Sequence, residues 1–267
     1  MSGETSPNGV PPVLDVRSLT KLYSGLSAVQ DVSFSIRAGE TLGYLGPNGA
    51  GKSTTVKMLT GLLEPTDGQV LFHGENIKND LIGYKQRVGY VPEEIHLYPF
   101  LTGWEYLELV SVLRGLEGRA FRKKTGELFR CFSLYEDKDS ALAAYSKGMR
   151  QRVMLIAAIV HNPDILIFDE PLSGLDVTYA MVFRNLVRLF SAQGKAIFYC
   201  SHVLEVVEKV CSHLLILSKG SVVAHGSVEE VRGKALTTSL EGRFSQLVEQ
   251  IDAEATAAEI LAAVNAY

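Results

Sequence analysis

A nine-residue run rich in glycine constrains this chain more than any other feature of its sequence. The run is Gly46, Pro47, Asn48, Gly49, Ala50, Gly51, Lys52, Ser53 and Thr54, and it fits the spacing G-x-x-x-x-G-K-[ST] of a phosphate-binding loop. We expect an apolar strand at 41–45 and a helix at 54–63, so that backbone N–H groups and the helix N-terminus converge on phosphate oxygens. Lys52 should then reach the β- and γ-phosphates of a nucleoside triphosphate, and Ser53 should hold Mg²⁺. A glycine-rich turn without a ligand is the alternative, which the flanking strand and helix disfavour.

The composition is that of an ordinary globular protein, long enough to bury a core. Of the 267 residues, 46% are hydrophobic and 21% are charged, which fits one large or two modest domains. The formal net charge of −4 argues against a nucleic-acid-binding protein, because such proteins usually have a basic surface. Cys131, Cys200 and Cys211 form no C-x-x-C pair, so we expect buried thiols in a reducing compartment rather than a metal site.

No stretch of the sequence predicts a membrane span or a signal peptide. The longest apolar runs, 153–160 and 165–168, fall well short of the roughly 20 residues that a spanning helix needs. The N-terminus lacks a basic start followed by an apolar middle, and residues 1–12, rich in Ser, Gly and Pro, are expected to form a disordered leader. We therefore expect a soluble, intracellular polypeptide.

Hydrophobic periodicity predicts an α/β core that is interrupted by helices. Apolar runs and alternating patterns predict strands at 13–20, 30–36, 41–45, 69–72, 88–91, 164–168, 196–200, 214–217 and 221–224. Helical spacing marks an insert at about 99–161 and a crossover helix at 177–190 between two parallel strands. The last two strands should pair as a hairpin. The sequence thus predicts one domain over 13–233, followed by a small helical tail at 234–267.

Two carboxylates follow a buried strand of this core. Asp169 and Glu170 come directly after Ile165–Phe168, at the carboxyl end where ligands bind in open α/β sheets. Asp169 can hold Mg²⁺ beside Ser53, and Glu170 can polarise a water for in-line attack on the γ-phosphate. A strand that simply ends in solvated acids is the alternative, which the phosphate loop upstream disfavours.

Three further motifs follow in the order known from one enzyme family. Residues 145–152 read Tyr-Ser-Lys-Gly-Met-Arg-Gln-Arg, residues 173–176 read Ser-Gly-Leu-Asp, and residues 200–202 read Cys-Ser-His. They resemble the signature, the D-loop and the switch histidine of the ATP-binding cassette (ABC) ATPases, and with the phosphate loop and the carboxylates they span almost the whole chain. The resemblance implies an α/β fold: a P-loop NTPase core with a mixed parallel sheet, an antiparallel N-terminal β subdomain and a helical ABC subdomain.

The resemblance also implies that ATP lies between two cassettes, since this chain carries one phosphate loop and one signature. Ser146 can cap the helix that follows, and N–H groups near Gly148 would point the positive end of its dipole towards the γ-phosphate of the other subunit. Asp176 is implied to organise the facing phosphate loop, His202 to donate a hydrogen bond to the γ-phosphate, and Tyr23 to stack on adenine. Ordinary capping or packing is the alternative for each of these residues.

Besides Tyr145, which takes the place of the leucine that opens the usual signature, three residues depart from the family pattern. Lys147 and Met149 stand in the signature where Leu-Ser-Gly-Gly-Gln has glycine and glutamine, and this form is similar to that of many bacterial exporter ATPases. Glu93 stands where the Q-loop has glutamine. Its carboxylate can still coordinate a hard cation, although it adds charge beside the triphosphate. A solvated loop acid is the alternative for Glu93.

Taken together, the motifs imply the ATP-hydrolysing subunit of an ABC transporter of the exporter type. The expected catalytic residues are Lys52, Glu170 and His202, and the expected Mg²⁺ ligands are Ser53, Asp169 and Glu93. The expected partners are a second ABC ATPase subunit and a separate transmembrane permease, with no nucleic acid. The permease would hold the chain on the inner face of the cell membrane.

Two questions stay open from the sequence. Apolar residues at 97–104 are expected to dock a permease helix, but core packing explains several of them equally well. A soluble ABC ATPase acting on ribosomes or DNA is the alternative function, and a non-hydrolysing nucleotide sensor is a third.

Overall fold

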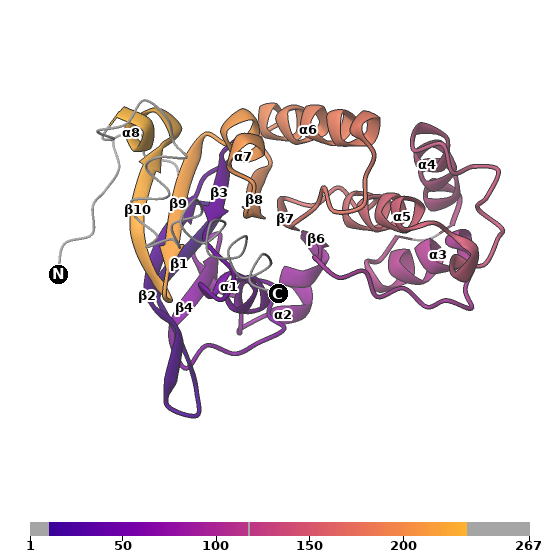
Figure 1. Ribbon diagram of the computed structural model, residues 1–267. Coiled ribbons are helices and arrows are strands. Elements are labelled where there is room, and N and C mark those ends of the chain that lie inside the picture. The colour runs from indigo at the N-terminus through magenta and orange to yellow at the C-terminus, as the bar shows by residue number, and fades with distance from the viewer. Residues whose placement is uncertain (1–10, 117, 234–267) are drawn as a thin grey trace, which may run out of the picture.

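Two β-sheets, the helices that accompany the larger sheet and a group of insert helices at one side make up the described part of the chain (Figure 1). The structure is a computed structural model that describes residues 11–116 and 118–233. Almost all of the expected leader at 1–12 and the whole expected tail at 234–267 lie outside these residues. In Figure 1, the helices between residues 103 and 159 lie together on the right, where α5 (Lys147–Ile159) packs beside β6 (Val88–Val91) and β7 (Ile165–Asp169) at the edge of the larger sheet.

The smaller sheet is antiparallel, as expected, and has the strand order β2-β1-β4-β5. Its strands are β1 (Leu14–Tyr23), β2 (Leu26–Ile36), β4 (Asp67–Phe72) and β5 (Glu75–Asn76). β2 begins four residues earlier than predicted, because a tight turn at Ser24 and Gly25 pairs Tyr23 directly with Leu26. Both turn residues have positive φ, the conformation that matches the twist of hairpin strands.

The larger sheet is mixed and has the order β10-β9-β3-β8-β7-β6. Its strands are β3 (Thr41–Leu45), β6 (Val88–Val91), β7 (Ile165–Asp169), β8 (Ala196–Ser201), β9 (His213–Ser218) and β10 (Ser221–Ser227). Five of them run parallel, and β10 pairs with β9 in the predicted antiparallel hairpin. β3, β7 and β8 are buried along their whole length, which explains why their sequences are continuously apolar.

Helices surround this sheet and form the insert. The sheet is accompanied by α1 (Lys52–Leu59), α2 (Leu81–Gln86), α6 (Val177–Ala192), α7 (Leu204–Val210) and α8 (Val228–Gly233), and the insert contains α3 (Gly103–Leu113), α4 (Gly118–Cys131), η1 (Leu142–Ala144) and α5 (Lys147–Ile159). α1 is shorter than the predicted 54–63 because Gly61, with a φ of 65°, follows its end. No helix of the described residues is both long and apolar enough to cross a membrane.

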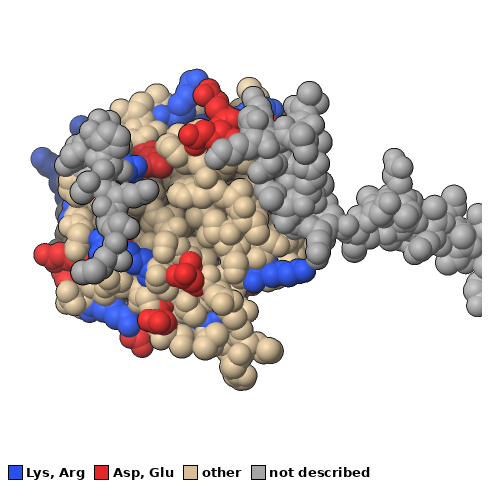
Figure 2. All heavy atoms as spheres, turned by 90° about the vertical axis from the view of Figure 1, so that its left-hand side faces the viewer, with Lys and Arg blue, Asp and Glu red and all other residues tan. Residues whose placement is uncertain are grey.

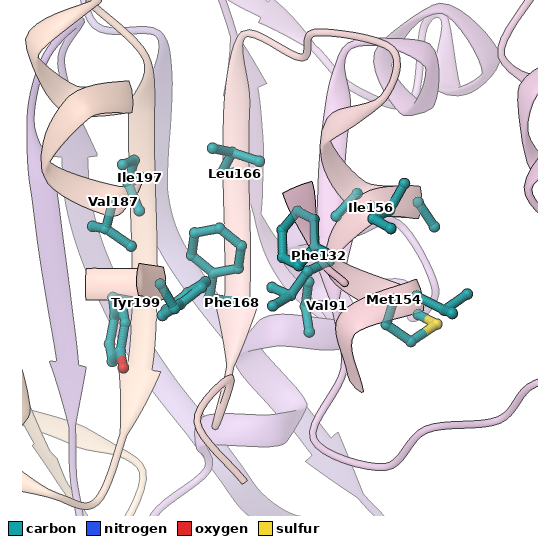
Figure 3. Close-up of a cluster of buried hydrophobic side chains, with 14 of the residues drawn as sticks. Val91, Phe132, Met154, Ile156, Leu166, Phe168, Val187, Ile197 and Tyr199 are labelled. Atoms are coloured by element: carbon teal, nitrogen blue, oxygen red, sulfur yellow. The ribbon is translucent and has the colours of Figure 1, made fainter. Parts of the chain in front are cut away.

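The larger sheet buries a hydrophobic cluster on each face. Along β7, Ile165 and Ile167 join one cluster with α1 and the smaller sheet, whereas Leu166 and Phe168 join the other with α5, α6 and α7. Figure 3 shows the second cluster, in which Phe168 lies between Tyr199 of β8 and Val91 of β6. The alternation of strand side chains thus fixes β7, and with it the carboxylates at its end, between two packed layers.

The segment before α3 is only partly buried. Leu97 and Leu101 of this segment and Trp104 of α3 are half-buried and pack against the core, as the core-packing alternative expects. Tyr98 and Phe100 are 61% and 92% exposed. The expected docking surface is therefore reduced to these two rings.

Candidate active site

The phosphate loop joins β3 to α1, and its backbone requires glycine. Gly49 and Gly51 have φ values of 77° and 104°, which residues with side chains rarely adopt. A Cβ atom on Gly51 would lie 2.3 Å from the carbonyl oxygen of Ala28. α1 begins at Lys52 without a side-chain cap. Its first N–H groups are therefore available to an anion held by the loop.

Lys52 is held over the loop by the loop's own backbone. Its Nζ donates hydrogen bonds to the carbonyl oxygens of Gly46 (2.7 Å) and Pro47 (3.1 Å), and the residue is 9% exposed. These contacts keep the ammonium group at the mouth of the loop, where the sequence predicts it.

Asp169 ends β7 as a buried acid, only 4% exposed. The pKa of its carboxyl is raised to about 6, mainly because burial disfavours the charged form. The nearby carboxylates of Glu93 and Glu170 raise the pKa as well. A cation beside Asp169 would favour the charged form.

Glu170 and His202 are in direct contact, although they stand 32 residues apart in the sequence. Glu170 has a φ of 46°, an uncommon conformation that concentrates at functional sites. Its carboxylate accepts hydrogen bonds from the backbone N–H of His202 (2.8 Å) and from the hydroxyl of Ser201 (3.1 Å). The Nδ1 atom of His202 lies 2.6 Å from the same carboxylate. Three contacts therefore hold the carboxylate of Glu170, the expected general base, in place.

One cavity of about 310 Å³ brings most of the expected site residues together. Its walls are Ala28, Asn48, Gly49, Gly51, Lys52, Ser53, Thr54, Glu93, Asp169, Glu170 and His202. The hydroxyl and carboxylate oxygens among them suit Mg²⁺, which proteins usually hold through one or two carboxylates together with substrate phosphates. Of the described residues, no three His, Cys, Asp or Glu side chains are placed to hold a metal ion by themselves.

Seven expected site residues do not line this cavity: Gly46, Pro47 and Ala50 of the phosphate loop itself, and four residues outside the loop. Tyr23 is at the end of β1, 46% exposed, with the ammonium group of Lys21 5.6 Å from its ring centre. Ser146 caps α5 by accepting the backbone N–H of Met149 (3.2 Å), and Gly148 lies in the first turn of that helix. Asp176 caps α6 by accepting the N–H of Tyr179 (2.9 Å). The capping roles weighed for Ser146 and Asp176 are thus confirmed.

Sequence reasoning missed three residues that shape the site. Ser201 donates to Glu170, and Ala28 supplies both a wall of the cavity and the carbonyl beneath Gly51. Cys200 is buried beside Asp169. Burial raises the pKa of the Cys200 thiol, and the negative charges of Asp169 and Glu170 raise it further. Ser201 and Cys200 stand next to the predicted His202, a position that could have pointed to them. No sequence signal singles out Ala28.

Comparison with known proteins identifies the family. The family model for "ABC transporter" matches residues 29–173. An uncharacterised ABC transporter ATP-binding protein of Nostoc sp. is 36% identical over 249 residues, which cover 90% of this chain and 74% of that protein. The Nod factor export ATP-binding protein I of Ralstonia nicotianae is 35% identical, over 84% of this chain and 70% of that protein.

Solved structures agree with this assignment. An ATP-binding subunit of an ABC transporter superposes with a TM-score of 0.83 at 33% identity, over 88% of this chain and 99% of that one. MJ0796, a bacterial ABC transporter cassette solved as a dimer, gives a TM-score of 0.74 at 25% identity, over 80% and 98% of the two chains. These similarities do not favour a soluble ABC ATPase acting on ribosomes or DNA. The chain belongs to the ABC transporter family, as an ATP-binding and ATP-hydrolysing subunit.

Proposed function

We propose that the chain hydrolyses ATP with Mg²⁺ in a sandwich formed by two cassette subunits, and thereby powers export through a separate permease. One observation carries the proposal. Lys52, Ser53, Asp169, Glu170 and His202 line a single cavity, whereas the signature residues Ser146 and Gly148 stand on the N-terminus of a different helix and do not line it. A second subunit can supply its signature to this cavity.

Each residue has a role that follows from its position. The loop N–H groups and Lys52 bind the phosphate charge, and Tyr23 stacks on the base. Ser53 and Asp169, with Glu93 beside them, hold Mg²⁺, which neutralises charge on the β- and γ-phosphates when it is bound. Glu170 accepts a proton from the attacking water.

The signature and the switch histidine complete the site. Because Nδ1 of His202 contacts the carboxylate of Glu170, Nε2 is the ring nitrogen that can donate a hydrogen bond to the γ-phosphate. The partner subunit's signature adds its capped helix N-terminus on the opposite side of that phosphate, and Asp176 acts at the same subunit boundary.

The transport role rests on the family and on the signature. The Tyr-Ser-Lys-Gly form of the signature and the similarity to a Nod factor export protein favour export. A permease would hold the chain at the cytoplasmic face of the membrane. Nucleic acid is not an expected partner. The net charge is −4, and the face in Figure 2 carries both acidic and basic side chains instead of a basic patch.

Replacing Glu170 by glutamine tests the site. Glu170→Gln removes the proton acceptor and keeps the size of the side chain, so ATP turnover should fall by about 10²–10⁴-fold while ATP binding persists. The variant should also accumulate as an ATP-bound dimer in light scattering. Glu94→Gln, at an exposed neighbouring acid, is the matched control. Turnover at the wild-type rate in Glu170→Gln would refute the assignment.

A further inference from the structure

Two segments with different tasks lie against each other inside one subunit. The first is the signature turn, residues 145–149, which in the proposed dimer serves the ATP of the partner. The second is the D-loop segment, residues 171–176, which begins directly after Glu170 of the subunit's own ATP site and ends at Asp176, which the proposed dimer places at the subunit boundary. A contact between these two segments therefore links the partner's ATP site to the subunit's own ATP site.

Two contacts join the signature turn itself to the D-loop segment, and a third starts from Gln151, further along α5. The buried amide of Gln151 donates to the carbonyl oxygen of Pro171 (2.9 Å). Gly148 approaches the backbone so closely that a Cβ atom on it would lie 3.0 Å from the carbonyl oxygen of Gly174. Nearer the surface, the Nζ of Lys147 donates to the hydroxyl of Ser173 (3.2 Å). The amide of Gln151 is buried and the Gly148 approach involves backbone alone, whereas the contact of Lys147 with Ser173 joins two exposed side chains.

The stem of Lys147 covers the D-loop segment as well. A Cβ atom on Gly174 would lie 2.9 Å from both Cγ and Cε of Lys147, so the lysine fills the space that a side chain there would need. Gly174 has a φ of 82°, a conformation that glycine adopts readily. The absence of a side chain at Gly174 therefore makes room for the lysine.

Helix stability does not explain this lysine. Lys147 is the first residue of α5, and a cation at a helix N-terminus opposes the helix dipole. Its position is accounted for by its contacts with Ser173 and Gly174, which lie outside the helix.

We propose that Lys147 is a positioning residue that couples the two ATP sites of the dimer, by tying the signature turn to the D-loop segment through Ser173. When the signature turn meets the partner's phosphate, the contact transmits the shift to the segment that begins beside Glu170. This inference rests on the two-subunit site proposed above.

A double-mutant cycle on the full-length chain tests the coupling. Lys147→Met keeps the stem over Gly174 and removes the ammonium group, and Ser173→Ala removes its acceptor. The readout is the rate of ATP hydrolysis against ATP concentration. Each variant should lower the Hill coefficient towards 1 and reduce kcat roughly two- to tenfold, and the double variant should be no worse than either one. Lys147→Arg should restore cooperativity, and Lys123→Met, at an exposed lysine of α4, should change nothing.

The other outcomes overturn the inference. Loss of activity in Lys147→Met but not in Ser173→Ala would mean that the lysine acts directly on the partner's phosphate. Additive losses, unchanged variants, or a wild-type enzyme that hydrolyses ATP without cooperativity would each show that this contact carries no coupling, and would leave the proposed function intact. A wild-type chain that does not hydrolyse ATP would instead contradict the proposed function itself.

Discussion

Three acids share the small cavity around the phosphate loop, and the charges of two of them act on the third, the buried Asp169. Glu93 and Glu170 both contribute to the raised pKa of Asp169, which is about 6. In the proposed site, Asp169 must be charged to hold Mg²⁺. Because protonation competes with the metal, binding of Mg²⁺ should weaken as the pH falls through about 6.

Glu93→Gln should shift this pH dependence of Mg²⁺ binding to lower pH. The substitution removes one nearby charge and keeps an oxygen ligand, so the pKa of Asp169 should fall and the weakening of Mg²⁺ binding should begin at a lower pH. Turnover at neutral pH should stay within roughly tenfold of the wild type. The measurement is the Mg²⁺ concentration for half-maximal ATPase activity between about pH 5.5 and 7.5.

Glu94→Gln controls for the loss of one negative charge, because Glu94 is exposed and does not line the cavity. The account of Glu93 fails if Glu93→Gln abolishes turnover with ATP binding intact, or if the pH dependence of the two variants is the same.

At the scale of elements, the segment between β6 and α3 contains Glu93, which lines the cavity, and carries two exposed rings a few residues further on. This segment begins just after the strand that leads to Glu93, and it presents Tyr98 and Phe100 to solvent. Exposed aromatic side chains of this kind are typical of binding surfaces.

Phe100→Ala should therefore weaken docking to the permease without harming the fold, because a side chain that is 92% exposed contributes little to the core. The measurement is the fraction of the chain that sediments with membranes of the source cells. Ile82→Ala, which truncates a 76% exposed residue of α2, is the matched control. Equal membrane fractions for Phe100→Ala and the wild type would rule out this surface.

Elements with a strong pattern were predictable, and short ones were not. The buried parallel strands stand out as short apolar runs, and the helices of the insert stand out because they repeat a helical hydrophobic spacing over several turns. α2 and α7 have only six and seven residues, too few for a clear helical period. The contacts of Glu170 with His202 and of Lys147 with Ser173 join distant segments, so only the folded chain reveals them. The domain boundaries at 13 and 233 stay predictions.

At the scale of the whole molecule, the two-fold symmetry of the proposed dimer determines how many intact ATP sites form when two variants are mixed. In a two-fold dimer each ATP meets Glu170 of one subunit and the signature of the other. A subunit without a working base can still offer its signature, and a subunit with a blocked signature can still offer its base.

Mixing two inactive variants should therefore restore activity. Ser146→Asp keeps a good cap on α5 but sets a negative charge against the partner's phosphate, and Glu170→Gln lacks the base. In a random mixture half of the dimers contain both variants, and one of their two sites is intact, so ATPase activity should reach up to about a quarter of the wild-type value. Ser146→Asn, an equally good cap without charge, should be far more active alone than Ser146→Asp. If the mixture is no more active than its separate components across a range of protein concentrations, the two variants belong to the same site, and each subunit hydrolyses ATP without the signature of the other.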